Sequence, residues 1–380
     1  MKRRFFRGLP LVVAVLLATS CSKDENNDKE VVNSGTEVVT PENNVKTVPF
    51  TLKVKNGKGI SKVSYADNGT EVQPSFEVGD KVVISGTGIS DTELTCEKVE
   101  DGVAVFTGDI ASGIADGTTL TATVKVNEGS VTVSSTTSMV DLIENCAHNY
   151  EGTFEYTSGK DAECTLKDDK SYLEFTLAEG QKKVSVNGTW YDVNQTSHQA
   201  WVAVDGGATV VTRIKGSKQV TAGVIYTIEC TDVVDLGPDW NIFWKAANET
   251  ENSSLVFQGL AYYDWAAAEV FASQDANGYR LPTKTEMESL YALAQGGYVN
   301  KDNVSYKEFS NEYGSVFLQP AGYKDSDDDP VLGVGAYWTN TVYNDERIWR
   351  LKFNTGTNNI GVNDGDLKSC HLSVRLVRGL

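Results

Sequence analysis

Five residues near the C-terminal end carry the side-chain types that recognise sugars: Trp338, Asn340, Tyr343, Trp349 and Arg350. Aromatic rings stack on the apolar C–H faces of a carbohydrate, while amides and charged groups bind its hydroxyls. Tryptophans also fill the cores of folded domains. Packing is therefore the default role for each ring, and ligand contact by part of this group is the hypothesis.

An acidic run a few residues earlier has the oxygen ligands of a metal site. Asp325, Asp327 and Asp329 stand at alternate positions. Ca²⁺ takes roughly six to eight oxygen ligands, and a bound cation would relieve the repulsion between these carboxylates. The run does not follow an EF-hand loop, because Pro330 replaces the glycine and Ala336 replaces the final glutamate. A solvated turn is the expectation, calcium is the alternative, and no cofactor is predicted.

The sequence offers little to support catalysis. It contains neither a nucleophile elbow nor a His-Glu-x-x-His motif. With 3 histidines and no Cys-x-x-Cys, it lacks the ligands of a zinc cluster. Cys370 and His371 are adjacent, and neighbours on a strand point to opposite faces. We predict a protein that is not an enzyme. An unrecognised enzyme stays as an alternative, because carboxylate pairs need only meet in space.

The N-terminus has the features of a lipoprotein export signal. Residues 2–7 are rich in Lys and Arg, and residues 9–18 are apolar but too few to span a bilayer as a helix. The stretch Ala18-Thr19-Ser20-Cys21 resembles a bacterial lipobox, with Ala18 where leucine is more usual. We expect residues 1–20 to be a signal peptide and Cys21 to carry the lipid that anchors the chain in the outer membrane. An ordinary secretory signal is the alternative.

Residues 21–48 are polar, and we expect a flexible acidic tether. Lys23-Asp24-Glu25, just after the lipid cysteine, resembles the surface-export signal of Bacteroidota lipoproteins. This resemblance implies display on the cell surface. A plain linker that leaves the protein in the periplasm is the alternative.

Composition favours strands and excludes one class of partner. The chain has 34 glycines, 8 prolines and a formal net charge of −18. Such an acidic chain does not attract nucleic acid or anionic lipid through its general field. Besides Cys21 there are five cysteines, which cannot all pair: Cys96, Cys146, Cys164, Cys230 and Cys370. Buried free thiols are the preferred expectation, with a Cys146–Cys164 disulfide as the alternative.

Two consecutive blocks, residues 49–148 and 149–230, show the alternation of half-buried strands. Phe50, Leu52 and Val54 point one way while their neighbours point the other. Further strands are expected at 77–84, 103–106, 120–126, 172–177, 183–186, 201–204 and 224–228. Asp-Gly and Asn-Gly turns separate several of them. Each block is predicted to be a β-sandwich, and residues 139–143 between them form either a helix or a strand.

Residues 231–380 have a mixed α+β pattern. Residues 262–272 are rich in alanine, with apolar side chains at helical spacing. Thr283 and Glu286 form a capping box for a second helix at about 284–293. Arg280 is expected to brace the preceding loop through its guanidinium. Strands are expected at 338–340, 348–353 and 372–378.

Short motifs in these blocks resemble two families of domains. Residues 76–81 and 222–228 resemble segments of fimbrillin-like proteins of Bacteroidota. The motifs of the last block are similar to the Fibrobacter-type major paralogous (FISUMP) domain and to the C-terminal domain of Legionella collagen-like proteins. They are residues 235–237 with Trp244, Trp265, residues 278–283, residues 337–339 and residues 373–378.

The second resemblance implies a C-type-lectin-like α+β fold related to formylglycine-generating enzymes. It also implies that Trp338, at a motif position, packs in the core. Those enzymes use a pair of active-site cysteines, whereas this block has only Cys370. The calcium-dependent sugar motifs of animal lectins, Glu-Pro-Asn and Trp-Asn-Asp, are also absent from the sequence.

Together these patterns predict a multidomain protein with two all-β sandwich (fimbrillin-like) domains followed by an α+β C-type-lectin-like domain. The expected function is that of a surface-anchored lipoprotein in adhesion, whose last block recognises a glycan or a cell-surface protein. The first alternative is a fimbria-associated structural or accessory subunit, which would dock with other fimbrial subunits through its strand edges. The second is an enzyme with the fold of formylglycine-generating enzymes.

Overall fold

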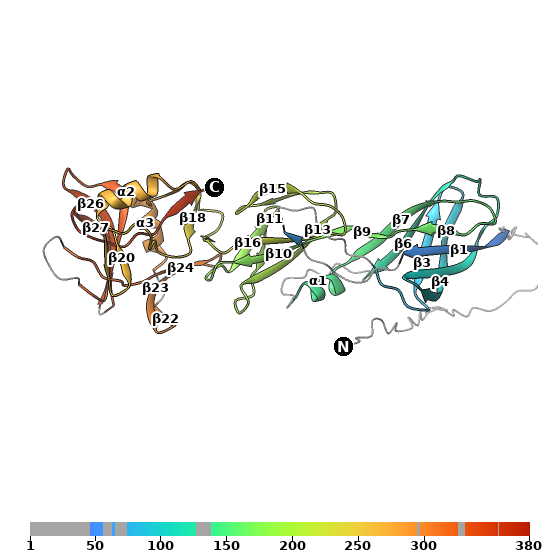
Figure 1. Cartoon of the computed structure of the whole chain (residues 1–380), viewed down its shortest axis with the longest axis horizontal. Coiled ribbons are helices and arrows are strands. Elements are labelled where there is room, and N and C mark those ends of the chain that lie inside the picture. Colours follow the sequence, from blue (N-terminus) through green and yellow to red (C-terminus); the bar gives the residue numbers. More distant parts are fainter. Residues whose placement is uncertain are drawn as a thin grey trace, which may run out of the picture. The chain divides into compact units, whose positions relative to one another are not determined.

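A computed structural model of the chain describes residues 46–55, 63–64, 74–126, 138–294, 297–325, 331–355 and 357–380, and strands predominate in these segments (Figure 1). Cys21, the predicted signal peptide and most of the predicted tether lie outside the described residues. Asp327 and Asp329 also lie outside them. Among the described residues, no helix has both the length and the apolar character needed to cross a bilayer.

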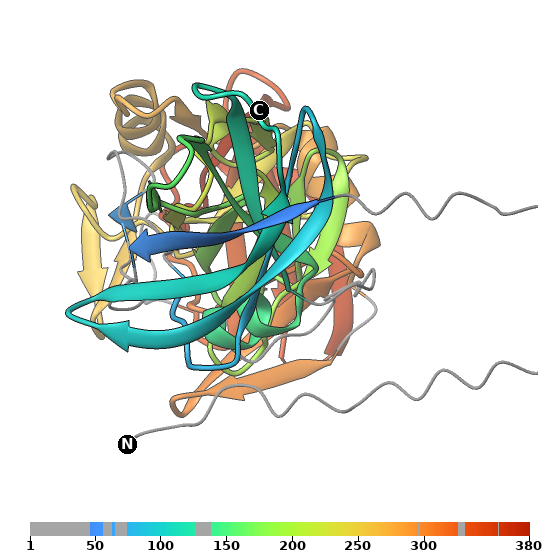
Figure 2. The same cartoon turned by 90° about the vertical axis from the view of Figure 1, so that its right-hand side faces the viewer.

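The first region is one eight-stranded sheet. In sheet order its strands are β8 (Ala162–Cys164), β1 (Thr47–Lys55), β5 (Val103–Ala111), β4 (Ile89–Glu100), β3 (Lys81–Gly86), β6 (Thr119–Val126), β7 (His148–Glu155) and β9 (Lys167–Asp168). Phe50, Leu52 and Val54 are buried in its core, as their alternation predicts. Viewed from one end, the blue-to-teal strands of this sheet run in strongly different directions, as expected of a twisted sheet (Figure 2).

The two edges of this sheet approach each other. A Cβ atom at Gly152 in β7 would lie 2.4 Å from the carbonyl oxygen of Thr165, which follows β8. Glycine therefore allows this close passage, and a larger residue would push the segments apart. The predicted boundary at 148/149 falls at the start of β7, and the sheet continues to Asp168. The predicted sandwich is thus built as a single curled sheet.

The second region has two four-stranded sheets that share a core. One has the order β13 (Gln199–Asp205), β10 (Lys170–Leu177), β16 (Ile225–Cys230), β2 (Val63–Ser64); the other has the order β12 (Thr189–Asp192), β11 (Lys183–Val186), β14 (Thr209–Thr212), β15 (Gly216–Gln219). Leu173 and Phe175 from the first sheet pack with Val184 and Val210 from the second. The open choice for residues 139–143 is settled in favour of a helix, α1 (Met139–Asn145).

The third region mixes strands and helices. Its sheets have the orders β17 (Val233–Asp235), β18 (Ile242–Lys245), β28 (Val377–Gly379), β21 (Tyr279–Arg280); β19 (Leu255–Phe257), β20 (Leu260–Tyr262); β22 (Tyr298–Lys301), β23 (Val304–Ser310), β24 (Ser315–Leu318); and β25 (Val334–Val342), β26 (Arg347–Asn354), β27 (Thr357–Leu367). The strand expected at 372–378 is shorter than predicted, because Leu372 and Ser373 make only isolated bridges.

Both predicted helices of this region are present. α2 (Trp265–Ser273) begins later than expected because the Asp264 carboxylate accepts a hydrogen bond from the Ala267 amide and caps it there. α3 (Lys284–Ala292) has the predicted capping box of Thr283 and Glu286.

The second and third regions are joined by hydrogen bonds and by shared core. The Gln181 side chain accepts from the Asp235 amide at 2.7 Å and donates to the carbonyl oxygens of Asp235 and Tyr313. Ala178 packs in the same cluster as Val234 and Leu236. Residues 45–380 form one compact unit. The predicted boundary at 230/231 therefore lies next to an extensive polar and apolar junction.

The cysteines Cys96, Cys146, Cys164, Cys230 and Cys370 are all buried and carry free thiols. This agrees with the preferred expectation of small apolar packing residues. The alternative, a disulfide between Cys146 and Cys164, is not formed. Instead the Cys146 sulfur lies 3.5 Å from Nδ1 of His148, inside a buried polar group that includes Asp168 and Tyr172.

Candidate functional site

The predicted sugar-contact residues lie on the β25–β26 hairpin, where a register change shapes the strand. Trp338 pairs with Arg350 and Val342 pairs with Ile348, so three residues of β25 oppose Trp349 alone. Such a bulge bends a strand and redirects the side chains that follow it. The Thr339 hydroxyl donates to the Trp349 carbonyl at 2.6 Å and holds this irregular segment in place. The five predicted residues are divided between three environments: an exposed surface, the core and a buried ion pair.

Tyr343 and Trp349 form an accessible aromatic pair. Their ring centroids are 5.1 Å apart and their planes meet at 85°. Tyr343 is 46% exposed, while Trp349 is partly buried. An edge-to-face arrangement is favourable for aromatic rings and restricts the freedom of both side chains. The pair is therefore a preformed aromatic surface at the end of the hairpin.

Lys284, the first residue of α3, covers one part of this surface. Its ammonium lies 4.1 Å from the centroid of the Trp349 ring and 3.1 Å from a carboxylate oxygen of Glu288. The Lys284 amide also donates to the Thr341 hydroxyl at 2.9 Å. The start of α3 is thus attached to the hairpin by backbone and side chain, and a cation–π contact steadies the indole. Tyr343 is left as the more accessible of the two rings.

Asn340 adds an exposed amide to the same end of the hairpin. Its backbone N–H donates to the carbonyl of Pro282 at 2.9 Å, in the loop before α3. Its side-chain oxygen accepts from the Thr341 hydroxyl at 3.2 Å. An exposed amide at this end of the hairpin can supply a hydrogen bond to a sugar-like or peptide-like ligand.

Trp338 packs in the core, which is the default role of a tryptophan. It is fully buried, and its indole N–H donates to the carbonyl of Tyr263 at 2.7 Å. It packs with Phe243, Leu281 and Ile348. Trp338 therefore lies in the core, as the resemblance implied, and away from the accessible rings.

Arg350 lies on the opposite face of β26 from Trp349 and is only 8% exposed. Its guanidinium pairs with the carboxylate of Asp366 and lies 5.6 Å from the centre of the Tyr323 ring. Adjacent strand residues point to opposite faces, so Arg350 cannot share a surface with Trp349. The structure separates Arg350 from the predicted ligand group.

Asp325, from the predicted metal group, lies near Arg350. Ligand atoms of Asp325, Asp366 and Cys370 all lie within 4.8 Å of one another. The Cys370 thiol donates to the Asp325 carboxylate at 3.2 Å, and burial, reinforced by Asp325, raises the pKa of Cys370 to about 11. Calcium prefers oxygen ligands to a thiol, and Arg350 already balances Asp366. This arrangement favours a neutralised polar cluster over a divalent cation.

Arg280 braces the loop before α3, as predicted. Its guanidinium donates to both carboxylate oxygens of Glu286, at 2.8 and 2.6 Å, and to the Leu281 carbonyl. Burial alone would raise the pKa of Glu286, but the hydrogen bonds from Arg280 and from the Thr283 backbone outweigh burial and lower it. The loop and the α3 N-terminus that carry Lys284 are therefore firmly positioned.

Two contributors were not identified from the sequence. The sequence pattern places Lys284 in a helix without indicating its partner, and it gives no signal for Asp366. Lys284 contacts Trp349, which is distant in the sequence. Asp366 pairs with Arg350 on the neighbouring strand. The capping box at Thr283 indicates that a helix begins at Lys284. It does not indicate the partner of Lys284, because tertiary packing decides which side chains meet.

Comparison with known proteins identifies no family for this chain. No family model and no curated protein matches the sequence. Solved structures that resemble it include a fimbrial protein from Bacteroides ovatus, with 9% identity, a TM-score of 0.24, and coverage of 88% of this chain and 99% of that chain. A fimbrial assembly protein from Parabacteroides distasonis has 11% identity and a TM-score of 0.25, with coverage of 49% of this chain and 92% of that chain.

A protein assigned to cell adhesion from Bacteroides uniformis gives a similar result. Its identity is 12% and its TM-score 0.26, with coverage of 49% of this chain and 93% of that chain. Identities and scores this low carry no conclusion about the fold or function of the chain described above. The mainly β architecture stands on the strands and sheets themselves.

Proposed function

We propose that this chain is a non-catalytic adhesion protein that binds a glycan or a surface protein through the end of the β25–β26 hairpin. The observation that carries the proposal is the accessible, preformed pair of Tyr343 and Trp349, with the Lys284 ammonium over the Trp349 ring and the exposed Asn340 on the same hairpin. Adhesion and fimbrial roles are also named for the solved structures above, but support for the proposal comes from this surface.

The physical reason is that exposed aromatic and apolar side chains gain when a partner covers them. Val342, next to Tyr343, is 51% exposed. Apolar side chains exposed together, with polar groups around them, are typical of interaction sites. A sugar ring can stack on Tyr343 while its hydroxyls bind Asn340. An aromatic anchor of the same kind is frequent at the centre of protein–protein contacts.

We also propose that the residues before position 46 attach the chain to the cell surface. Lipid on Cys21 would anchor the chain in the outer membrane, and the acidic tether would hold residues 46–380 at the cell surface. A lipid anchor does not depend on electrostatic attraction to lipid headgroups, so it is compatible with the net charge of −18. The same negative charge makes nucleic acid an unsuitable partner. A C-type-lectin-like class for residues 231–380 also remains part of the proposal.

The test is a broad glycan array, together with an array of cell-surface proteins, probed with the whole chain. The whole chain is needed because Ala178 and Gln181 complete the packing of residues 231–380. We expect wild type and the control variant Tyr291→Ala, whose ring is 41% exposed on α3, to bind the same spots. Tyr343→Ala should lose them. Failure of the wild type to bind either array, or unchanged binding by Tyr343→Ala, would overturn the proposal.

A further inference from the structure

A separate hollow of about 480 Å³ lies beside the C-terminal end of α2. Its walls include Lys245, Glu249, Glu251, Phe271, Gln274 and Asp275. Binding sites for small molecules have volumes of roughly 300–1,000 Å³. The hollow is not part of the hairpin surface: Trp265, at the start of α2, contacts Thr339, whereas Phe271 and Gln274 are at its other end. Nine helical residues separate these ends by about 13 Å.

The inner wall of the hollow is preformed. The buried Arg375 donates to the Lys245 carbonyl at 2.7 Å and to the Asn248 side chain at 2.9 Å. The Glu249 amide donates to the Val374 carbonyl at 3.0 Å. These bonds fix the segment after β18 against the chain before β28. A wall held in this way does not have to be ordered when a ligand binds.

The positive charge of Lys245 is already used within this wall. Its ammonium lies 2.6 Å from a carboxylate oxygen of Glu249, which is 6% exposed, and 5.1 Å from the centroid of the Tyr279 ring. This ion pair neutralises Glu249. Lys245 is therefore not available to balance the acids at the rim.

The rim of the hollow carries a surplus of negative charge. Glu251 is exposed and Asp275 is partly exposed, and within the described part of the chain neither carboxylate forms an ion pair. α2 has no basic residue in its last turn. The C-terminal end of a helix carries partial negative charge, which favours a nearby cation. The two carboxylates and the C-terminal end of α2 therefore all attract a cation to the rim.

Phe271 supplies an apolar contact between these charged groups. It is partly buried, and its ring packs against Tyr263 with centroids 5.9 Å apart. An aromatic ring attracts a cation placed over its face and also packs against an aliphatic stem. The Gln274 amide and the Thr250 hydroxyl, both in the lining, add hydrogen-bonding groups.

We propose that this hollow binds a small polar ligand through an ammonium or guanidinium group. The cation lies between Glu251, Asp275 and the end of α2, and the body of the ligand contacts Phe271 and Gln274. Two sources share this chemistry, an amino sugar of a glycan and a basic side chain of a protein.

Saturation-transfer NMR on the whole chain distinguishes the two sources. The probes are glucosamine, Nα-acetyl-lysine methylamide and Nα-acetyl-arginine methylamide, each titrated separately. The neutral controls are N-acetylglucosamine and the lysine probe acetylated on its side chain. Binding of glucosamine alone assigns the hollow to an amino sugar, and binding of the amino-acid probes alone assigns it to a basic protein side chain.

Variants test the placement. Glu251→Gln and Asp275→Asn keep hydrogen-bond acceptors, and each should weaken binding about three- to fivefold, as expected for a partly exposed ion pair. Glu269→Gln, on α2 but outside the lining, should bind like wild type. The proposal is overturned if no cationic probe binds wild type, if the neutral controls bind equally well, or if Glu269→Gln weakens binding as much as the two rim variants.

Discussion

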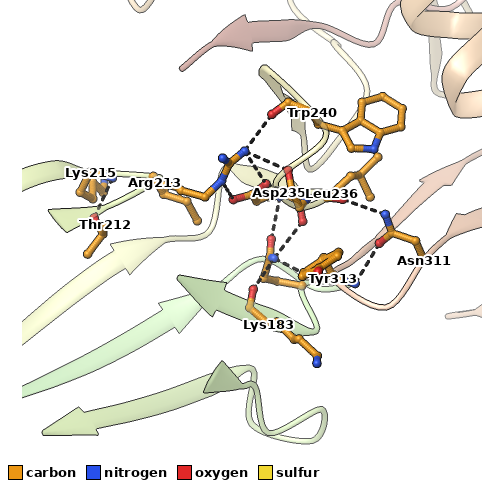
Figure 3. A network of polar contacts seen from close by, with 12 residues as sticks. Lys183, Thr212, Arg213, Lys215, Asp235, Leu236, Trp240, Asn311 and Tyr313 are labelled. Atoms are coloured by element: carbon orange, nitrogen blue, oxygen red, sulfur yellow. Dashed lines mark hydrogen bonds and ion pairs between the residues drawn. The ribbon is translucent and has the colours of Figure 1, made fainter. Parts of the chain in front are cut away.

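The Arg213 guanidinium holds the Asp235 carboxylate, with Nε 2.9 Å from Oδ2 and one Nη 3.4 Å from Oδ1. The same guanidinium donates to the carbonyls of Gly237 and Trp240 (Figure 3). Arg213 follows β14 in the second region, and Asp235 ends β17 in the third. This contact therefore ties the two regions together. Burial raises the pKa of Asp235, while Arg213 and the Gly237 amide oppose the rise without cancelling it.

Removal of Arg213 should destabilise the chain strongly. Asp235 is only 1% exposed, so Arg213→Ala leaves a buried carboxylate without its cation, at a cost of about 3 kcal/mol at neutral pH. Chemical unfolding of Arg213→Ala, with Lys215→Ala as a nearby control, measures this. A difference from wild type no larger than that of the control would show that Arg213 does not support the junction.

The loss in Arg213→Ala should also depend on pH. Without Arg213, the folded-state pKa of Asp235 rises further above its unfolded value of about 3.9. The penalty for the charged form is therefore absent below the unfolded pKa and develops as the pH rises through the folded pKa. Stability curves from pH 3 to 8 should show the two proteins converging in acid. A constant difference across this range would contradict the role given to the Asp235 charge.

Glu286 should show the opposite pH dependence. Its folded-state pKa is lowered, so its contribution is complete above the unfolded value of about 4.3 and disappears as the pH falls through the folded value. Glu286→Gln keeps the capping geometry and removes the charge, and we expect a loss of about 1 kcal/mol at pH 7, since Arg280 is partly exposed. Glu269→Gln is the control. Equal losses at pH 7 and pH 3 would contradict this assignment.

The local elements of the fold were predictable from the sequence, because their signals are local. Alternation at Phe50, Leu52 and Val54 predicted β1, and the capping box predicted the start of α3. The divided roles of Trp338 and Trp349 were not predictable in the same way. Trp338 pairs with Arg350, and alternation along β26 puts Trp349 on the other face, but which face is covered depends on packing between distant segments.

Contacts between distant segments were equally hidden. Gln181 meets Asp235 and Lys284 meets Trp349 through the packing of whole regions. For the same reason, the predicted boundaries at 148/149 and 230/231 did not reveal that β7 continues the first sheet or that Ala178 contributes to the last core.

A variant of Arg350 tests whether this residue lies outside the binding surface formed by Tyr343 and Trp349. Because its side chain is buried beside Asp366, Arg350→Gln should reduce stability by about 3 kcal/mol and leave binding at the hairpin unchanged. Unfolding curves and array binding of the same preparation separate the two effects. Loss of binding in a variant that remains folded would return Arg350 to the binding surface.

Trp338 and Trp349 should differ in what they contribute. Trp338→Phe removes the hydrogen bond to the Tyr263 carbonyl and leaves a gap in the core, at a cost of roughly 1–3 kcal/mol. Trp349→Phe, at a partly buried position, should cost less and should weaken binding instead. The same pair of measurements on both variants tests this. Equal losses of stability would contradict the separation of core ring from surface ring.

The most direct test is the affinity of the whole chain for its best array ligand, measured calorimetrically for wild type, Tyr343→Ala and Tyr291→Ala. We expect at least about tenfold weaker binding for Tyr343→Ala, as for a central aromatic anchor, with the same unfolding free energy as wild type. Tyr291→Ala should match wild type. If Tyr343→Ala binds as tightly as wild type, the hairpin surface is not the recognition site.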